Sequence, residues 1–248
     1  MVLKNNSLSF LNQGSSQDFI NALKAEAMNH PAVKHDYLTS LRDGKFNNMN
    51  EVIKDYAHQY SHYSSYFVRY LNGSIRSLKN PQHKESLRKN VIEEVGDKNS
   101  IDLAKKPHVE IFNHFKQTIG IDAIYEKNHP PSTTTLLWRD LFLQKCNSNI
   151  SGVSIGAIGL ATEYIVPTLY SFIKTAIEKH TDFPESATLF FKLHIECDDG
   201  HAETLNQVAE DIAEDLFNRE AIRFGVISAL NLRNTFWDSQ YARALKVG

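Results

Sequence analysis

Two histidines and an aspartate recur on one side of a predicted helix, in the pattern His194-x3-Asp198-x2-His201. At about 100° per residue, the three side chains fall within an arc of about 60°. The arc is centred on an apolar stripe made up of Ala187, Phe190, Leu205, Val208 and Ile212. Burying two imidazoles and a carboxylate costs several kcal/mol unless they are paired or bound to metal. The pattern therefore fits a transition-metal site, or a His–Asp–His hydrogen-bond network that closes a contact between helices.

A glutamate interrupts a second apolar helix, in the segment GVSIGAIGLATEYIVPTLYSFI. The helical wheel places Gly152, Gly156 and Gly159 on the same side as Glu163. Pro167 has no N–H to donate to the carbonyl of Glu163, so we expect the helix to kink or loosen there. Glu163 is then either a hydrogen-bonding partner in helix packing or a metal ligand.

A third candidate is the pair Glu93-Glu94 at the end of a helix, with His108 after the following loop. Acidic pairs commonly face water, so this pair alone indicates little. Together the candidates supply three carboxylates and three histidines. Helix-bundle di-iron and di-manganese sites use such residues, projecting inward from separate helices. Oxygen and nitrogen donors with open positions suit iron or manganese better than structural zinc.

The elements that must position these residues are helices, because helical periodicity dominates the chain and no alternating strand pattern stands out. Glycine, proline and asparagine punctuate the pattern, and no linker divides it. We therefore expect one all-α domain over residues 1–248, with a core at about 17–227. The predicted helices are 16–28, 32–41, 49–71, 83–95, 108–118, 133–145, 151–180, 184–217 and 220–245, of which the last two are open to interruption.

Composition excludes several classes of protein. With 42% hydrophobic and 23% charged residues, the chain is typical of globular proteins. A net charge of −2 offers no basic excess for nucleic acid. The stretch 150–173 contains glycines, Pro167 and Glu163, and is too broken for a membrane span of about 20 apolar residues. Two cysteines and a polar N-terminal segment without a signal-like apolar run favour the cytoplasm.

The motifs IEEVG, His108, ATEYIVP and HIECDDGH occur in the order found in haem-oxygenase-like di-metal oxidases, and the chain resembles the CADD-like branch over about residues 17–227. The resemblance implies a bundle of about seven or more helices, with a TenA- or PqqC-like fold. It implies six metal ligands: Glu94, His108, Glu163, His194, Asp198 and His201. Glu94 and His108 would bind one metal, and Glu163 would be shared between two. The implied reaction partners are two iron ions (manganese is the alternative), dioxygen and a small organic substrate, in a protein whose bundle type favours a homodimer.

The loop before His108 is longer than is usual in that family. This leaves the choice between Glu93 and Glu94 open and makes His114 an alternative to His108. We prefer Glu94, because the family's acidic residue commonly stands just ahead of the glycine that ends the helix, here Gly96.

Two further features bear on the reaction. In relatives that form p-aminobenzoate by consuming their own tyrosine, a tyrosine directly precedes the shared glutamate, whereas Thr162 stands there in this chain. The side-chain-consuming reaction is therefore not carried over, although the aromatic segment 56–70 could place a phenol near the metals. Other functions that remain open are a non-redox, thiaminase-like protein with a cysteine nucleophile (Cys146 or Cys197) and a protein-interaction module without catalysis.

Overall fold

The computed structural model describes residues 14–196 and 199–247, and within these ranges it is helical without β-strands, as the all-α class predicts. The α-helices are α2 (Ser16–Asn29), α3 (Asp36–Arg42), α4 (Met49–Ser64), α5 (Phe67–Ser77), α6 (Pro81–Val95), α7 (His108–Thr118), α8 (Ala123–Asn128), α9 (Thr133–Cys146), α10 (Ser151–Ile155), α11 (Val166–His180), α12 (Leu189–Glu196), α13 (Asp199–Ile212) and α14 (Leu216–Val247). Two short 3₁₀ helices, η1 (Leu103–Lys105) and η3 (Glu185–Thr188), and a π-helix, η2 (Gly156–Glu163), complete the order.

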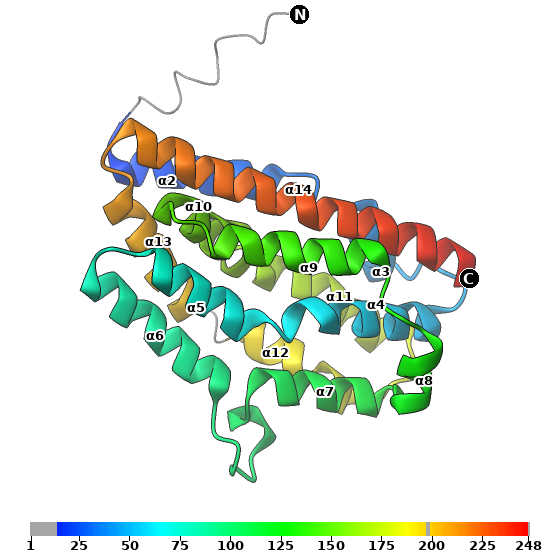
Figure 1. The fold of residues 1–248 in the computed structure, drawn as a ribbon. Coiled ribbons are helices and arrows are strands. Elements are labelled where there is room, and N and C mark those ends of the chain that lie inside the picture. Colours follow the sequence, from blue (N-terminus) through cyan, green and yellow to red (C-terminus); the bar gives the residue numbers. More distant parts are fainter. Residues whose placement is uncertain (1–13, 197–198, 248) are drawn as a thin grey trace, which may run out of the picture.

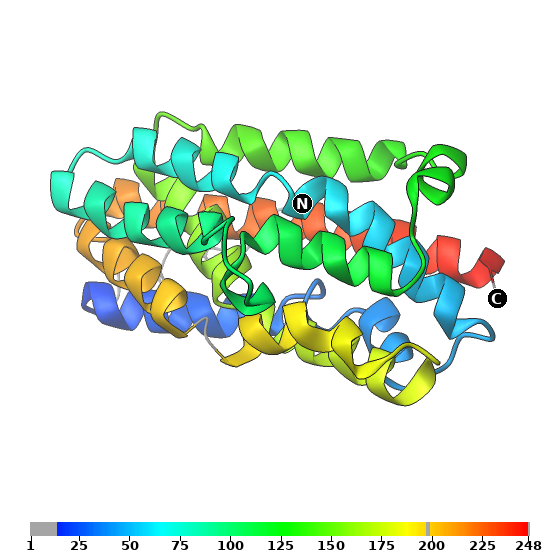
Figure 2. The ribbon, with the colours of Figure 1, turned by 90° about the horizontal axis from the view of Figure 1, so that it is seen from below.

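The longest helix, α14, runs along one side of the bundle and packs against α2, α3, α9, α10 and η2 (Figure 1). On the side turned away from α14 lie α6 and α7, and α12 and α13 run along one flank (Figure 2). The contacts of α6 with α7 and α13, and of α7 with α12, bring together the helices that carry the candidate ligands.

The predicted helix over residues 49–71 is wrong as a single element, because the chain forms α4 and α5 with a break at Ser65 and Tyr66. Consecutive serines at 64 and 65 favour such a bend, and Tyr66 N donates to the carbonyl of Tyr63 in a tight turn. The helix expected from residue 32 begins instead at Asp36, since His35 Nδ1 accepts from the backbone N–H of Tyr37 and caps it there. The short α8 was not predicted.

The expected loosening near Pro167 is present as the π-helix η2, which ends at Glu163. In it Tyr164 N donates to the carbonyl of Gly159, five residues earlier. Glycine is required at Gly156, since a Cβ there would lie 2.2 Å from the carbonyl oxygen of Ile222 in α14. The small residues therefore serve close packing, and the π-helix turns Glu163 into the interior, where it is 3% exposed.

One helical run, Ser151–His180, is long and apolar enough to cross a membrane by composition. Of its most apolar window, 83% is buried inside the bundle, as is usual for a core helix.

Candidate metal centre

The end of α6 and the start of α7 bring Glu94 and His108 together despite the long loop between them. The loop closes at its base, where Asp97 N donates to the carbonyl of Lys105 at 2.8 Å. Gly96 has φ +51°, and a Cβ on it would lie 2.6 Å from the backbone of Lys106. The additional residues therefore project outward from the bundle (Figure 1), and the distance between the two side chains does not depend on loop length.

Glu94, His108 and His194 form a cluster in which one ligand atom from each lies within 4.8 Å of the others. His108 Nδ1 is 3.0 Å from Glu94 Oε1, and the rings of His108 and His194 lie with centroids 4.6 Å apart. Two ligand atoms at right angles on one ion, each about 2.1 Å away, would be separated by about 3.0 Å. Glu94 and His108 are joined by a hydrogen bond in the structure, and their spacing also suits two ligands of a single ion.

The orientation of His194 is set by its own helix. Its Nδ1 lies 2.7 Å from the carbonyl oxygen of Phe190, to which it donates. The lone pair then lies on Nε2, which is the arrangement that metal-binding histidines show. Phe190 and Tyr170 pack against the His194 ring at centroid distances of 4.2 and 5.5 Å, which holds it in place.

Glu163 lines the same cavity as Glu94, His108 and His194. Its π-helix packs on α13, where a Cβ on Gly159 would lie 3.1 Å from Leu205. The main chain of His201 belongs to the first turn of α13. The side chain of His201 and all of Asp198 lie outside the described part of the structure, so their positions relative to Glu163 stay a prediction.

A small cavity of about 80 Å³ adjoins the cluster. The break between α4 and α5 forms part of its wall. The lining residues apart from the four candidate ligands are Tyr60, Tyr63, Ser64, Ser65, Phe67, Val68, Val109, Phe112, Thr162, Val166, Tyr170 and Phe190.

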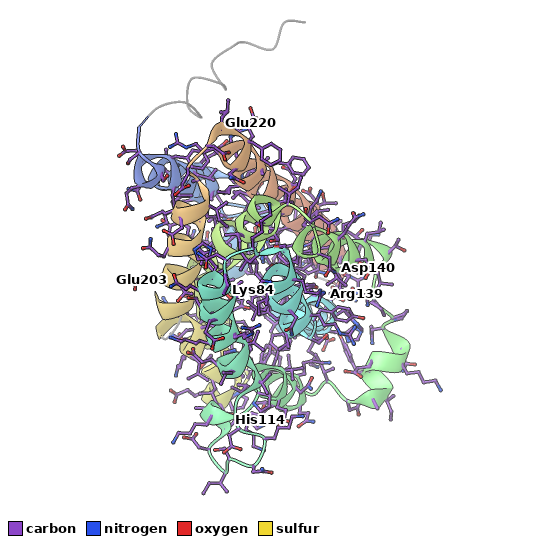
Figure 3. All side chains as sticks on the ribbon, turned by 60° about the vertical axis from the view of Figure 1, so that its left-hand side comes forward. Lys84, His114, Arg139, Asp140, Glu203 and Glu220 are labelled. Carbon is purple, nitrogen blue, oxygen red and sulfur yellow. The ribbon has the colours of Figure 1, made fainter. Side chains whose placement is uncertain are left out.

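The residues left as alternatives lie elsewhere. Glu93 is exposed, whereas its neighbour Glu94 is 8% exposed and belongs to the cluster. His114 is not part of the cluster, and Figure 3 shows it near the end of the molecule where the α6–α7 loop projects. Cys146 is fully buried, and burial raises the pKa of its thiol, so it is a poor nucleophile.

The sequence predicted only some of the hydroxyl groups that line the cavity. Tyr60 and Tyr63, two of the aromatic residues of segment 56–70, line the cavity, and the Tyr60 hydroxyl lies 2.9 Å from that of Tyr170. Sequence reasoning missed Arg233, which is 1% exposed behind this wall. The sequence could have pointed to Arg233, because this charged residue interrupts the apolar stripe of α14 between Leu230 and Trp237.

The donor set fits iron. Two imidazoles and one carboxylate with open positions form the ligand set of non-haem Fe(II) oxygenases, and Glu94, His108 and His194 supply those three groups. Glu163 adds a second carboxylate on the cavity wall. Among the described residues no cysteine joins this cluster, in contrast to many structural zinc sites.

Known proteins provide an independent comparison. The chain is 22% identical over 222 residues to the 4-chloro-allylglycine synthase of Streptantibioticus cattleyicolor. The aligned region covers 90% of this chain and 82% of that protein. A CADD-like protein from Nostoc punctiforme superposes with a TM-score of 0.72 at 15% identity, covering 91% of this chain and 98% of the other. A TenA homologue from Pseudomonas syringae superposes with a TM-score of 0.70 at 13% identity, covering 98% of this chain and 99% of the other.

These structural likenesses show a fold shared with CADD-like and TenA proteins, as the resemblance implied. The sequence pattern of one family, described as iron-containing redox enzymes, matches residues 54–234. That range includes every candidate ligand. The chain therefore belongs to the haem-oxygenase-like family of iron-containing redox enzymes.

Proposed function

We propose that the protein is a di-iron oxidase or oxygenase that uses dioxygen to oxidise a small organic substrate. The observation that carries the proposal is the meeting of Glu94, His108 and His194 from three helices at the wall of one cavity. These side chains meet only because α6, α7 and α12 converge. A contact that served helix packing alone would not need a carboxylate and two imidazoles at one point.

The full ligand set of the proposal has six members: Glu94, His108, Glu163, His194, Asp198 and His201. The first two serve one metal, Glu163 is shared, and the last three complete the pair. Iron is the proposed metal because the family is iron-containing, with manganese as the alternative for oxygen and nitrogen donors.

The protein's own groups orient the ligands and shape a largely apolar pocket. The carbonyl of Phe190 fixes the tautomer of His194, and aromatic side chains surround its ring. Bound iron would supply the one-electron and dioxygen chemistry that side chains lack. The pocket would hold the substrate beside the metals and exclude competing water.

The substrate is proposed to be small, because the cavity measures about 80 Å³. The name of the curated relative refers to an amino-acid product, which makes amino acids a reasonable first group of substrates to test. Oxidation of the protein's own side chain is a further form of the proposal, with Tyr60, Tyr63 and Tyr170 as the phenols on the cavity wall.

A non-redox, thiaminase-like function is the second candidate, supported by the similarity to a TenA homologue. Among the described residues it lacks a suitable nucleophile, because Cys146 is buried and burial raises its pKa. Cys197 lies outside the described part. Retention of any thiamin-cleaving activity in a Cys197→Ser variant would remove the cysteine mechanism for this chain.

The test is metal stoichiometry combined with oxygen uptake. Protein reconstituted with Fe(II) without oxygen is expected to bind two ions per chain by elemental analysis, and to consume dioxygen when exposed to air. A His201→Ala variant should lose iron, and a His83→Ala variant, whose histidine instead pairs with Asp211 at the surface, should keep it. Equal iron binding by the His201→Ala variant and the parent protein would refute the ligand assignment.

A further inference from the structure

A run of contacting aromatic rings leads from the cavity wall into the bundle. Tyr60, which lines the cavity, stacks on Tyr56 with ring centroids 5.3 Å apart. Tyr56 stacks on Trp237 at 6.2 Å, and Trp237 stacks on Tyr37 at 5.7 Å. We call these residues, together with Tyr170, whose hydroxyl lies 2.9 Å from that of Tyr60, the aromatic chain. Every member is a phenol or an indole, the aromatic side chains that give up an electron most readily.

The far end of the aromatic chain approaches the surface. Phe46 contacts both Tyr37 and Tyr241, with a centroid distance of 5.9 Å in each case. Tyr241, near the end of α14, is only partly buried. The aromatic chain therefore connects the cavity, through Phe46, with a phenol that solvent reaches.

Packing alone does not account for these residue types. The hydroxyls of Tyr37 and Tyr56 and the indole N–H of Trp237 are buried, and none has a hydrogen-bond partner among the described residues. Leaving such a group unpaired destabilises the fold. Phenylalanine would fill the space of either tyrosine without that cost, and this protein uses phenylalanine at 14 other positions. The electron-rich rings therefore serve something besides packing.

The charges around the aromatic chain favour the outward movement of a positive charge. Burial raises the pKa of Tyr60, Arg233 lowers it, and the Glu163 carboxylate raises it by less than Arg233 lowers it. At the other end burial raises the pKa of Tyr37, and Asp55 adds to that rise more than its ion-pair partner opposes it. A positive charge on a ring is thus repelled near the cavity and attracted at the far end.

The other tryptophan lies among cations. Trp138 stacks on Tyr63 at 3.8 Å, and the guanidinium of Arg233 lies 5.3 and 5.6 Å from the centroids of these two rings. Two further arginines lie over Tyr66, the partly exposed phenol on that side. A cation over a ring opposes the removal of an electron from it. In the described part of the chain no such contact involves a ring of the aromatic chain, so Trp138 and Trp237 form an internal comparison.

We propose that the aromatic chain carries single electrons from the surface to the cavity, so that an oxidising equivalent left there without substrate is reduced before it damages the cavity wall. Tyr60 gives up one electron, and its proton leaves through Tyr170 to solvent water at the cavity. Trp237 then returns an electron to Tyr60, which takes its proton back by the same route. Trp237 keeps its N–H proton throughout and is reduced through Tyr241.

The electron that enters at Tyr241 comes from a small one-electron reductant in solution, such as ascorbate. The reductant is oxidised by one electron, the oxidising equivalent in the cavity is reduced by one, and the side chains end unchanged. The supply of that oxidising equivalent rests on the proposed function, in which dioxygen is the oxidant. The conduction of charge along the rings does not, and it can be measured without iron.

The first test applies an oxidant from outside to iron-free protein. Photogenerated tris(bipyridine)ruthenium(III) is a bulky one-electron oxidant that cannot enter the bundle. Trp138 is 2% exposed and Trp237 is 0% exposed, so direct attack reaches neither. Peptide mass spectrometry counts the oxidised form of each. We expect Trp237 to be oxidised at least fivefold more than Trp138.

Two conservative variants locate the route. Tyr241→Phe keeps a ring against Phe46 and removes the phenol, so oxidation of Trp237 should fall at least threefold. Tyr125→Phe is the matched control, because Tyr125 is a partly buried phenol that stacks on His129. It should leave the oxidation of Trp237 unchanged.

The second test measures protection. Protein loaded with Fe(II) is exposed to dioxygen with ascorbate present and no substrate, and oxidised Tyr60 is counted by peptide mass spectrometry. Trp237→Phe keeps an aromatic ring but no longer supplies an electron-rich indole. It should accumulate at least threefold more oxidised Tyr60 than the parent protein.

Equal oxidation of Trp138 and Trp237 would overturn the inference, and so would oxidation of Trp237 that Tyr241→Phe leaves unchanged. If Tyr241→Phe fails to fold, the ratio of the two tryptophans in the wild-type protein decides. Oxidised Tyr60 at the parent level in a folded Trp237→Phe variant would overturn the protective role.

The inference and the proposed function fail in different ways. Preferential oxidation of Trp237 in a protein whose iron-loaded form consumes no dioxygen would sink the proposed oxidase and leave the aromatic chain standing. Dioxygen uptake without preferential oxidation of Trp237 would do the reverse.

Discussion

Two pairs of histidines in this bundle look alike and differ in their charged neighbours. The rings of His108 and His194 have centroids 4.6 Å apart, and those of His58 and His62 are 5.1 Å apart. The first pair comes from two helices and meets the buried carboxylate of Glu94. The second pair occupies successive turns of α4, where its charged neighbours are Lys116 and Glu126.

The electrostatic consequence is visible at His62, where the pKa is lowered to about 4. Burial is the main cause, and the positive charges of His58 and Lys116 add to it. Burial likewise lowers the pKa of His58. Lys116 is tied to Glu126 by an ion pair of 2.5 Å, which uses the nearest carboxylate. At the second pair the carboxylate of Glu126 is paired with Lys116, whereas at the first pair Glu94 contacts His108 itself. We infer that a carboxylate directed at the histidines, and not histidine spacing, distinguishes the metal centre.

The largest test of this contrast is the loss of one imidazole from each pair. We expect His194→Ala to weaken Fe(II) binding by about 100-fold or more, since it removes a direct ligand, and His62→Ala to change it less than twofold. Metal titration followed by elemental analysis measures both. Equal losses in the two variants would mean that the contrast is wrong.

The carboxylates provide the next comparison. Glu94→Gln keeps the size of the side chain but removes the charge beside His108, and iron affinity should fall about 10- to 100-fold. Glu126→Gln removes the ion-pair partner of Lys116 and should leave iron affinity unchanged. An affinity loss in Glu126→Gln as large as that in Glu94→Gln would contradict the assignment.

His58 and His62 should themselves differ in stability. His58 Nε2 lies 2.5 Å from the carbonyl oxygen of His129, to which it donates, so His58→Leu should lower the free energy of unfolding by about 1–2 kcal/mol. His62 Nε2 has no hydrogen-bond partner in the described residues, so His62→Leu should be neutral or slightly stabilising. Urea unfolding of both variants measures the difference, and a larger loss for His62→Leu would reverse our interpretation of the pair.

The smallest expected effect is on the pH dependence of stability. Above pH 6.5 His62 is neutral in both the folded and the unfolded chain, so it contributes nothing there. Between pH 6.5 and about 4 the unfolded chain takes up the proton first, and stability falls as the pH falls. Because His62 is only half-buried, we discount its contribution to about 1 kcal/mol, or about 2–4 °C in Tm. Between pH 6.5 and 4.5, the Tm of His62→Leu should fall less than that of the wild type. If Tm falls equally with pH in both proteins, His62 is not the cause.

The helices were largely predictable, because their caps are local. Ser15 caps α2 with a capping box, and Asn80 with Pro81 starts α6. The break between α4 and α5 was not predicted, since the apolar and aromatic pattern continues across Ser65 and periodicity does not register a bend. The π-helix was foreseen as a loosening near Pro167, but its length depends on how closely α14 and α13 approach its glycines.

In the candidate site, too, some features followed from the sequence and others only from the tertiary structure. The sequence by itself determined which groups face inward: His194 occupies an apolar register and is 8% exposed, and Glu163 is 3% exposed. By the same criterion Arg233, at 1%, belonged among the candidates. Only the tertiary structure decided that Glu94 and His108 meet across a long loop, because the backbone contacts of Gly96 and Asp97 close that loop at its base. It also decided which histidine pair has a carboxylate beside it, because charges that far apart in sequence become neighbours only through helix packing.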